Sequence, residues 1–254
     1  MRQRWTEKLK GLVRPWWFRT FHRGLPCYEC PVCKYRGPFK DRRTSRRPGE
    51  VREAAKCVRC GAAERHRVQW LVIDEKLTGW ATPQKRLLHI APEYCLQPKL
   101  QSLFGVYHTS DLFRKDCDFQ EDIQKMSFKD ASYDCVFVSR VLTKVPDHIA
   151  ATREVRRVLK PGGIAIFSEA YMHEKTVPQR EGNRQREMGL DLLDELGRHF
   201  SRVEQVLSNR YDPKHQLMNR VRLNGVMGVL SAQIPERLRV PDVGFMELVA
   251  VCYV

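Results

Sequence analysis

Two pairs of closely spaced cysteines constrain the N-terminal part of this chain more than any other feature. The pairs are Cys30-Pro-Val-Cys33 and Cys57-Val-Arg-Cys60, and 23 residues separate them. Each pair suits a tight turn that points both sulfurs at one centre, and two such turns complete the tetrahedral thiolate set that structural zinc prefers. The spacing therefore predicts a structural zinc ion held by Cys30, Cys33, Cys57 and Cys60.

The segment around these cysteines, residues 27–67, has few aliphatic side chains and cannot build a hydrophobic core of its own. Metal binding would supply the missing folding free energy. We therefore expect a zinc-ribbon module over this segment, with no open coordination position for catalysis. Two alternatives stay open here. Cys27 lies three residues before Cys30, which allows an iron–sulfur cluster, and His66 either replaces a ligand or forms a hydrogen bond near the ribbon.

Positive charge is concentrated in the same part of the chain. The 254 residues carry a formal net charge of +15. Residues 1–60 hold 17 Lys and Arg against 5 Asp and Glu, whereas residues 61–254 hold 28 against 25. A patch of this kind attracts a polyanion such as RNA, an anionic lipid surface or a phosphorylated substrate, unless it is simply a solvated face.

Residues 1–26 form a basic arm in which aromatic residues lie among Lys and Arg. Helical spacing relates four of its apolar side chains, Trp5, Leu9, Leu12 and Trp16. Pro15 is expected to kink or end that helix. A basic amphipathic segment binds a membrane surface, stacks on bases or packs against its own domain.

Composition limits where the protein works. No apolar stretch approaches the roughly 20 residues of a transmembrane helix, and the N-terminus lacks the apolar core of a signal peptide. We therefore expect a cytoplasmic protein without a transmembrane segment. In a reducing compartment, its nine cysteines are thiols or metal ligands rather than disulfides.

Strands and helices alternate after the cysteine-rich segment. Beyond a helix from about residue 62 to Gly79, helices are expected over 93–103, 147–159 and 186–200. Strands are expected over 86–91, 106–110, 133–139, 163–168, 203–208 and 245–253. Helices interleaved with buried strands predict an α/β fold with a doubly wound, mostly parallel sheet. The domain would span 68–254, with 209–244 as an insertion before the last strand.

An acidic residue follows the second strand at a spacing typical of sites for nucleotide-like ligands. Asp111 comes twenty residues after Ala91, where the first strand ends. An acid at this offset accepts hydrogen bonds from ribose hydroxyls, unless it is a plain loop acid, and open α/β sheets bind ligands at the carboxyl ends of strands. The glycine-rich turn that cradles a pyrophosphate is missing. The pattern favours a ligand with a ribose and no phosphate.

Several motifs then resemble, in order, those of class I S-adenosylmethionine (SAM)-dependent methyltransferases. The run from Glu154 to Gly163, followed by Ile164–Phe167, resembles their helix-to-fifth-strand signature, and Asp122–Phe128 with Ser132-Tyr133-Asp134 resembles another segment. Residues 57–67 and 88–93 resemble a subfamily with an N-terminal zinc ribbon and the signature C-G-x-x-E-R-H-R…L-H-x-A-P-E. The resemblance covers about residues 25–208. It implies a Rossmann-like, seven-stranded sheet and SAM-dependent methyl transfer.

The resemblance also implies roles for particular residues. Those implied to wall the SAM pocket are His89, Ala91, Pro92 and Glu93. Asp111 would hold the ribose, and Asp122 with Ile123 would contact the adenine. Ser139 and Arg140 would lie beside the methionine moiety.

One departure from the family leaves the catalytic base unassigned. Where relatives read H-V-L-E-H-V, residues 140–145 of this chain read R-V-L-T-K-V. Candidates for substrate chemistry therefore follow the fifth strand, namely Glu169, Tyr171, His173 and Glu174. The methyl acceptor is either RNA, held by the basic ribbon, or a small molecule or saccharide. The alternative is a catalytically degenerate protein that binds nucleic acid or a membrane surface.

Overall fold

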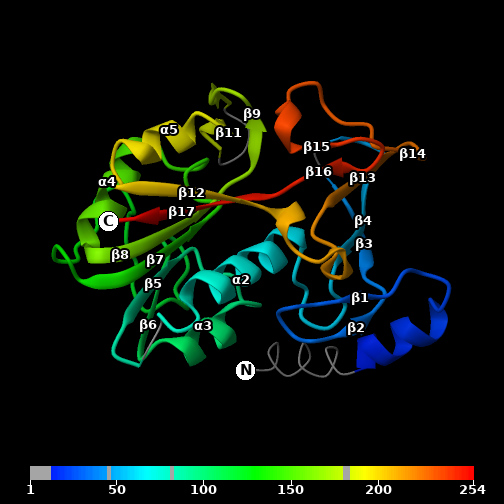
Figure 1. The fold of residues 1–254 in the computed structure, drawn as a ribbon, viewed down its shortest axis with the longest axis horizontal. Coiled ribbons are helices and arrows are strands. Elements are labelled where there is room, and N and C mark those ends of the chain that lie inside the picture. The colour runs from blue at the N-terminus through cyan, green and yellow to red at the C-terminus, as the bar shows by residue number, and fades with distance from the viewer. Residues whose placement is uncertain (1–12, 45–46, 81–82, 180–183) are drawn as a thin grey trace. The chain divides into compact units, whose positions relative to one another are not determined.

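The structure is a computed structural model that describes residues 13–44, 47–80, 83–179 and 184–254 (Figure 1). Its contacts divide the chain into two compact units. Unit 1 comprises Met1–Leu71, Ser208–Ala232 and Leu238–Glu247. Unit 2 comprises Val72–Leu207, Gln233–Arg237 and Leu248–Val254. The chain therefore passes between the units several times.

Unit 2 is built on a six-stranded sheet with the order β12-β17-β8-β7-β5-β6. In chain order these strands are β5 (Arg86–Ile90), β6 (Val106–Ser110), β7 (Tyr133–Ser139), β8 (Leu159–Ser168), β12 (Arg202–Leu207) and β17 (Leu248–Tyr253). Strand β5 is parallel to β6 and β7, and β7 is parallel to β8. Strand β17 is antiparallel to both β8 and β12. The expected alternation of strands and helices around a largely parallel sheet is confirmed.

A seventh strand is reduced to one bridge in the described part of the chain. Phe119 forms a single parallel bridge with Ser110 at the outer edge of β6. Next to that bridge, the carboxylate of Asp118 accepts hydrogen bonds from the backbone N–H and the hydroxyl of Thr109, both at 2.8 Å. A side chain thus satisfies donors that a longer ladder would have used, so six strands form where the resemblance implies seven.

The helices of this part of the chain are α2 (Glu64–Leu77), α3 (Gln97–Leu103), α4 (His148–Val158) and α5 (Leu192–Gly197). Figure 1 shows α4 and α5 on one side of the six-stranded sheet and α3 on the other. Helix α3 begins later than expected because Pro98 lies in its first turn, a position that proline favours. The Asp147 side chain caps α4 by accepting from the N–H groups of Ile149 and Ala150.

The helix expected over 186–200 is wrong over its first part. Arg186–Gly189 forms strand β11, which pairs in parallel with β9 (Tyr171–His173) and antiparallel with β10 (Val177–Pro178). Pairing with β9 and β10 overrides the local helical pattern here. The carboxylate of Asp191 closes this small sheet by accepting from the N–H and hydroxyl of Thr176.

Unit 1 holds a second sheet with the order β15-β16-β13-β4-β3, and β14 pairs with β13. Its strands are β3 (Lys40–Arg43), β4 (Glu50–Lys56), β13 (Asn219–Leu223), β14 (Val226–Met227), β15 (Arg239–Val240) and β16 (Gly244–Phe245). The stretch 209–244 therefore supplies most of the strands that cover the edge of β4, with Val221 opposite Arg52. The strand expected over 245–253 is divided into β16 and β17, which belong to different sheets.

The remaining elements of unit 1 lie near its N-terminus. The hairpin β1 (Tyr28–Glu29) and β2 (Arg36–Gly37) surrounds the first cysteine pair. A helix covers residues 13–21, so Pro15 does not end it. Trp5, Leu9 and Leu12 lie outside the described residues. Among the residues described, no helix is long and apolar enough to cross a membrane.

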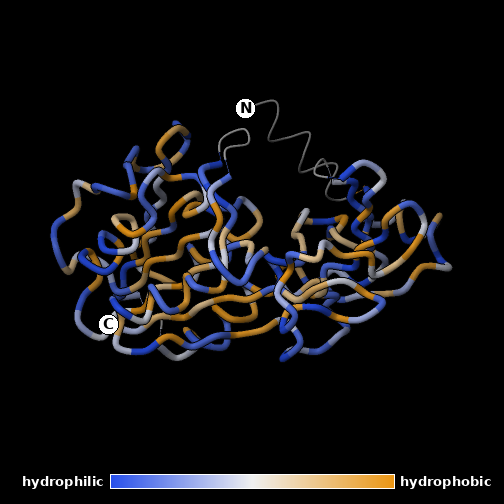
Figure 2. The backbone as a smooth tube through the Cα atoms, turned by 90° about the horizontal axis from the view of Figure 1, so that it is seen from above, coloured by the Kyte–Doolittle hydropathy of each residue, from blue (hydrophilic) through white to orange (hydrophobic). Residues whose placement is uncertain are grey.

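The core of unit 2 lies along its central strands. Val136, Phe137 and Val138 of β7 are fully buried, as is Leu88 of β5. Figure 2 shows hydrophobic stretches concentrated inside the molecule and hydrophilic stretches in many of the outer loops. Burial on both faces explains why these strands read as continuous apolar runs in the sequence.

We predict that Leu88→Ala lowers the free energy of unfolding by about 2–5 kcal/mol, because it leaves a cavity that neighbouring strands cannot fill. Urea denaturation measures this change. Leu112→Ala, at an exposed position of the same unit, serves as the control and should change the value by less than about 0.5 kcal/mol. Equal effects of the two substitutions would contradict the position of this core.

Candidate functional site

The carboxyl ends of four neighbouring parallel strands meet at one edge of the sheet in unit 2. Ile90 of β5 pairs with Ser110 of β6 and with Val138 of β7, and Ser139 of β7 pairs with Ser168 of β8. The residues that follow these strands are Ala91, Asp111, Arg140 and Glu169. The first three were predicted to hold a cofactor, and the fourth was a catalytic candidate, so the fold brings them to one edge.

Two of these residues have a left-handed backbone that non-glycine residues rarely adopt. The φ angle is 50° at Ala91 and 57° at Arg140. The N–H of Ala91 donates to the carbonyl of Ser110 at 2.8 Å, and the N–H of Arg140 donates to that of Ser168 at 2.9 Å. Each turn is thus tied to the end of the neighbouring strand. The left-handed conformation sets the direction in which the chain leaves β5 and β7.

His89 is fully buried and contacts Glu93 and Tyr107. Its Nε2 lies 3.0 Å from Oε2 of Glu93, and its Nδ1 lies 2.9 Å from the hydroxyl of Tyr107. Burial raises the pKa of Tyr107, so this hydroxyl keeps its proton and can donate to Nδ1. With Nδ1 as the acceptor, Nε2 carries a proton and donates to Glu93. The arrangement fixes Glu93 beside the Ala91 turn. Tyr107 was missed in the sequence because it is a strand residue without a motif.

Asp111 has one carboxylate oxygen engaged and one available. Its Oδ1 accepts from the N–H groups of Phe113 and Arg114 at 2.9 and 3.0 Å, which closes the turn after β6. Its Oδ2 accepts no hydrogen bond from the described residues, and the side chain is only half-buried. A charged oxygen fixed in direction at this edge can accept hydrogen bonds from two neighbouring hydroxyls.

Asp122 and Ile123 occupy the next turn. The carboxylate of Asp122 accepts from both the backbone and the side-chain amide of Gln124, at 2.9 and 3.0 Å to Oδ1. Ile123 is buried. The side chain of Asp122 is therefore already paired, and its contact with an adenine stays a prediction. Pro92 and Ser139 are also buried, whereas Glu93 and Arg140 are half-buried.

Glu169 is buried and holds the turn after β7. Its Oε1 accepts from the N–H groups of Val141 and Leu142 at 2.8 and 2.9 Å, whereas Oε2 is buried without a hydrogen-bond partner among the described residues. Burial raises the pKa of this carboxyl to about 7. These contacts suit Glu169 to position the Arg140 turn.

The other catalytic candidates differ in what they can do. Tyr171 is buried and its hydroxyl has no partner among the described residues, while burial raises its pKa and keeps it protonated. His173 has its Nε2 2.7 Å from Oε2 of Glu187. An imidazole oriented by a carboxylate is a common arrangement for a general base, which makes His173 the better-placed candidate. Glu174 is exposed.

The four predicted cysteine ligands form one cluster in unit 1. Their sulfur atoms all lie within 4.8 Å of one another, with 3.7 Å between Cys30 and Cys60 and 3.6 Å between Cys33 and Cys57. A tetrahedral zinc–thiolate centre with bonds of about 2.3 Å requires sulfur separations of about 3.8 Å, so the cluster fits such an ion. Cys27 is exposed and outside the cluster. His66 has the hydrogen-bonding role: its Nδ1 accepts from Ala63 N–H at 3.1 Å.

A buried arginine supports this cluster. The guanidinium of Arg67 is fully buried and donates to the carbonyls of Ala55 and Ala62 at 3.0 and 2.8 Å, and to that of Gln216. It also lies over the ring of Phe39 at 4.6 Å. Buried arginine needs compensation by negative charge, and the cysteine cluster interacts with it electrostatically. The sequence contains Arg67 within its E-R-H-R motif, but the motif alone does not show this role.

Comparison with known proteins supports one enzyme class. Residues 106–167 match a family model described as a methyltransferase domain. A demethylmenaquinone methyltransferase of Staphylococcus aureus (strain JH9) is 42% identical over 48 residues, which are 19% of this chain and 20% of that protein. A demethylmenaquinone methyltransferase of Staphylococcus carnosus is 37% identical over 59 residues, 23% of this chain and 24% of that protein. The matches thus span about a fifth to a quarter of these curated relatives.

The structural comparison agrees at the level of the fold. The N-methyltransferase NodS from Bradyrhizobium japonicum WM9 superposes with a TM-score of 0.50 at 18% sequence identity, covering 75% of this chain and 95% of NodS. At this identity the similarity shows a common fold. Together with the domain match over residues 106–167, it supports an enzyme with a methyltransferase domain. The enzyme class predicted from the motifs is confirmed at this level.

We predict that Glu169→Gln removes a pH dependence of stability. The pKa of Glu169 is raised from an ordinary 4.5 to about 7, so its contribution to stability is present below pH 4.5 and is lost as the pH rises through 7. Glutamine keeps an oxygen for the two N–H groups and does not titrate. As the pH rises from 4.5 to above 7, the free energy of unfolding of the native protein should fall by about 3 kcal/mol relative to that of the variant. This value takes about 1.36 kcal/mol for each unit by which the pKa is raised. Urea denaturation of both proteins at several pH values measures the difference, and a constant difference would contradict the burial of this carboxyl.

Proposed function

We propose that this protein transfers the methyl group of SAM to an acceptor, and that the cofactor binds at the carboxyl edge of β5, β6 and β7. The observation that carries the proposal is the Asp111 carboxylate, whose Oδ1 is fixed by two N–H groups while Oδ2 accepts none from the described residues. An acid at the end of the second strand suits a ribose, and the missing glycine-rich turn suits a ligand without a pyrophosphate. Both features fit SAM.

The chain's own residues would bind and orient the cofactor. The left-handed turn at Ala91 brings the backbone close to the ligand, with Pro92 and Glu93 beside it and buried His89 holding Glu93 in place. Ser139 and Arg140 would lie beside the methionine moiety, and Glu169 fixes their turn. Bound SAM supplies an activated methyl group, and alignment of acceptor and cofactor accounts for much of the catalysis in such reactions.

Proton removal from the acceptor is assigned to His173 in this proposal. Its Nε2 faces Oε2 of Glu187, which leaves Nδ1 to take a proton when the imidazole is neutral. Tyr171 keeps its proton because burial raises its pKa, and Glu169 is occupied with the Arg140 turn. The acceptor itself stays a prediction between RNA and a small molecule or saccharide.

We also propose that Cys30, Cys33, Cys57 and Cys60 hold a structural zinc ion. All four positions are thiols, so the ion has no open position for substrate and serves the fold of the ribbon. The buried guanidinium of Arg67 offsets the negative charge that a zinc tetrathiolate carries. Clustered thiols persist as metal ligands in a reducing compartment, and we therefore place the protein in the cytoplasm.

The cofactor proposal predicts that Asp111→Asn weakens binding of S-adenosylhomocysteine by about tenfold or more. Asparagine keeps an oxygen that can accept from Phe113 and Arg114, so the turn remains, but the charged Oδ2 becomes an amide donor. Hydrogen bonds to a charged acceptor contribute about 1.5–3 kcal/mol, and 1.4 kcal/mol corresponds to tenfold in affinity. Calorimetric titration measures the dissociation constants.

Asp116→Asn is the matched control for this titration, because it removes a carboxylate from the same loop. Asp116 pairs with Arg114, which also donates to the carbonyl of Pro92, so the loop keeps an anchor. The affinity of the Asp116→Asn variant for S-adenosylhomocysteine should remain within about twofold of that of the native protein. Native affinity in the Asp111→Asn variant would contradict the proposed ribose contact.

The metal proposal predicts about one zinc ion per chain in the purified protein, by elemental analysis. Cys57→Ser should abolish tight zinc binding and unfold the ribbon, since the segment has few apolar residues to replace the ion. Cys27→Ser is the matched control and should retain the zinc, because Cys27 lies outside the cluster. Visible absorbance from bound iron and sulfide instead of zinc would overturn this assignment.

A further inference from the structure

The helix over residues 13–21 and the turn after it expose an unusual amount of apolar surface. Five of the nine large hydrophobic side chains that are exposed in the described part of the chain lie between residues 13 and 25. They are Val13, Trp16, Trp17, Phe21 and Leu25. Tryptophan and phenylalanine at such exposure mark a surface that is covered in use.

Three of these side chains share one face of the helix. Val13, Trp17 and Phe21 are spaced four residues apart, and the rings of Trp17 and Phe21 lie 5.1 Å apart. Phe18 and His22 lie on the opposite side, stack at 4.0 Å and are half-buried. The exposed face is therefore distinct from the side of the helix that is already covered.

Cations flank this apolar face without any acid between them. The sequence from Lys8 to Tyr28 contains no Asp or Glu but five Lys and Arg. At 100° per residue, Arg14 borders this face on one side, Trp16 follows on the other side, and Arg19 lies farther around the helix beyond Trp16; Arg23 lies in the turn after the helix. An apolar stripe with tryptophan and basic borders is typical of a helix that lies in a membrane interface.

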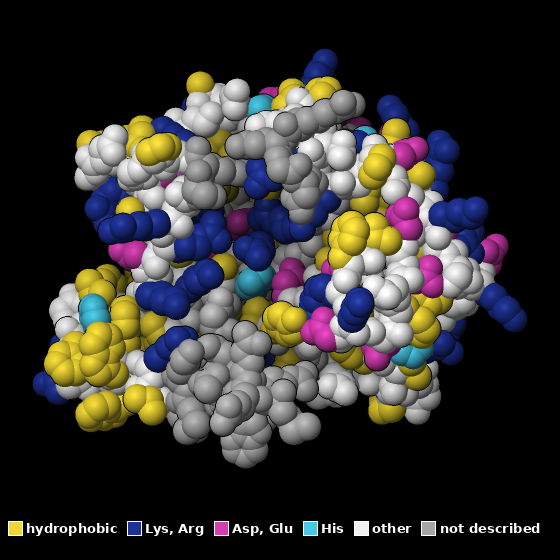
Figure 3. Space-filling model, turned by 180° about the vertical axis from the view of Figure 1, so that it is seen from behind, with side chains coloured by type: hydrophobic (Ala, Val, Ile, Leu, Met, Phe, Trp, Pro, Cys, Tyr) yellow, Lys and Arg dark blue, Asp and Glu magenta, His cyan; other side chains and the backbone are white. Residues whose placement is uncertain are grey.

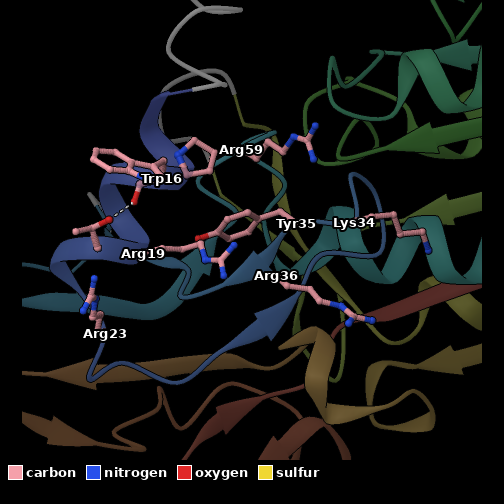
Figure 4. Close-up of a pocket in the computed structure, with 9 residues that line it drawn as sticks. Trp16, Arg19, Arg23, Lys34, Tyr35, Arg36 and Arg59 are labelled. Carbon is pink, nitrogen blue, oxygen red and sulfur yellow. Dashed lines mark hydrogen bonds between the residues drawn. The ribbon is translucent and has the colours of Figure 1, made fainter.

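A basic pocket of about 820 Å³ adjoins the same helix (Figure 4). Its lining contains no acidic residue and five cationic ones, Arg19, Arg23, Lys34, Arg36 and Arg59. Arg36 pairs with Glu29 at 3.0 Å, whereas the other four form no ion pair with a carboxylate in the described ranges. Clustered cations of this kind require a multivalent anion or several anions nearby.

The cysteine cluster fixes the wall of this pocket. Lys34 follows Cys33 directly, and Arg59 lies within the second cysteine pair, where its guanidinium donates to the carbonyl of Cys33 at 3.4 Å. Figure 4 shows these side chains around the same hollow as Arg19 and Arg23 from the helix. Folding of the ribbon thus positions cations from two turns beside the apolar helix.

We infer that this surface docks on a bilayer that contains anionic phospholipids, with lipid phosphates in the basic pocket and the Val13, Trp17 and Phe21 face in the interface. In Figure 3, hydrophobic side chains at the lower left lie next to Lys and Arg side chains, the combination that such a surface requires. The inference goes beyond methyl transfer and does not depend on it.

The apolar face favours lipid over nucleic acid as the occupant. A single-stranded nucleic acid needs aromatic rings beside its phosphates, but of the two rings that line this pocket only Trp16 is exposed, because Tyr35 is 5% exposed. Val13 and Leu25 offer no stacking surface, whereas hydrocarbon covers them well. Lipid head groups supply phosphates, and their acyl chains supply the apolar contact.

Vesicle co-sedimentation of the full-length, zinc-loaded protein tests the inference. Vesicles with one-third phosphatidylglycerol in phosphatidylcholine should bind it at least tenfold more tightly than pure phosphatidylcholine, with weaker binding at high salt. Both Trp17→Ala/Phe21→Ala and Arg19→Glu/Arg23→Glu should weaken that binding at least tenfold while retaining zinc. The assay contains no SAM, so its outcome is independent of the proposed methyl transfer.

A charge-matched control is Lys115→Glu/Lys129→Glu, which makes the same change in net charge at exposed positions of unit 2. It should bind anionic vesicles within about threefold of the native protein. Absence of vesicle binding, or an equal loss in this control, would overturn the inference. Tight binding of a 20-residue oligouridylate that requires Arg19 and Arg23, with no vesicle binding, would assign the surface to nucleic acid instead.

Discussion

The parallel pairing of β5, β6, β7 and β8 determines where chemistry can occur in this protein. Their register brings the residues that follow four strands to one edge of the sheet, although these residues are far apart in the sequence. Buried apolar strands fix that register, because a slip by one residue would reverse every side chain. The left-handed turns at Ala91 and Arg140 are tied to neighbouring strand ends and depend on it too. The packing of the core and the positions of the residues at this edge therefore depend on the same strand register.

In unit 1, the cysteine cluster holds together elements that are far apart in the sequence. The cysteine cluster joins the hairpin of β1 and β2 to the turn before α2, and Arg67 connects that turn to residues 208–232 through the Gln216 carbonyl. The unit thus combines a segment with few aliphatic residues and strands contributed from much later in the chain. The same cluster positions Lys34 and Arg59, so the proposed lipid-binding surface depends on the proposed metal site as well.

Short sequence patterns predicted the features of this structure that depend on residues close together in the sequence. Paired cysteines and buried strand runs carry their own signals: the four sulfurs cluster and the strands form as expected, while the zinc ion itself stays a prediction. The join between β4 and β13 could not be predicted, because Arg52 and Val221 are paired across most of the chain length. Strand β11 was mistaken for a helix because its partners override a helical pattern. The left-handed Ala91 has no signal in the sequence, since alanine rarely adopts that conformation.

The most direct test of the cofactor site is ultraviolet cross-linking of the zinc-loaded protein to SAM carrying a radioactive methyl group, followed by peptide mapping. The account predicts label on peptides that contain the residues following β5, β6 or β7, and loss of that label in excess S-adenosylhomocysteine. Label confined to unit 1, or label that S-adenosylhomocysteine does not displace, would contradict it.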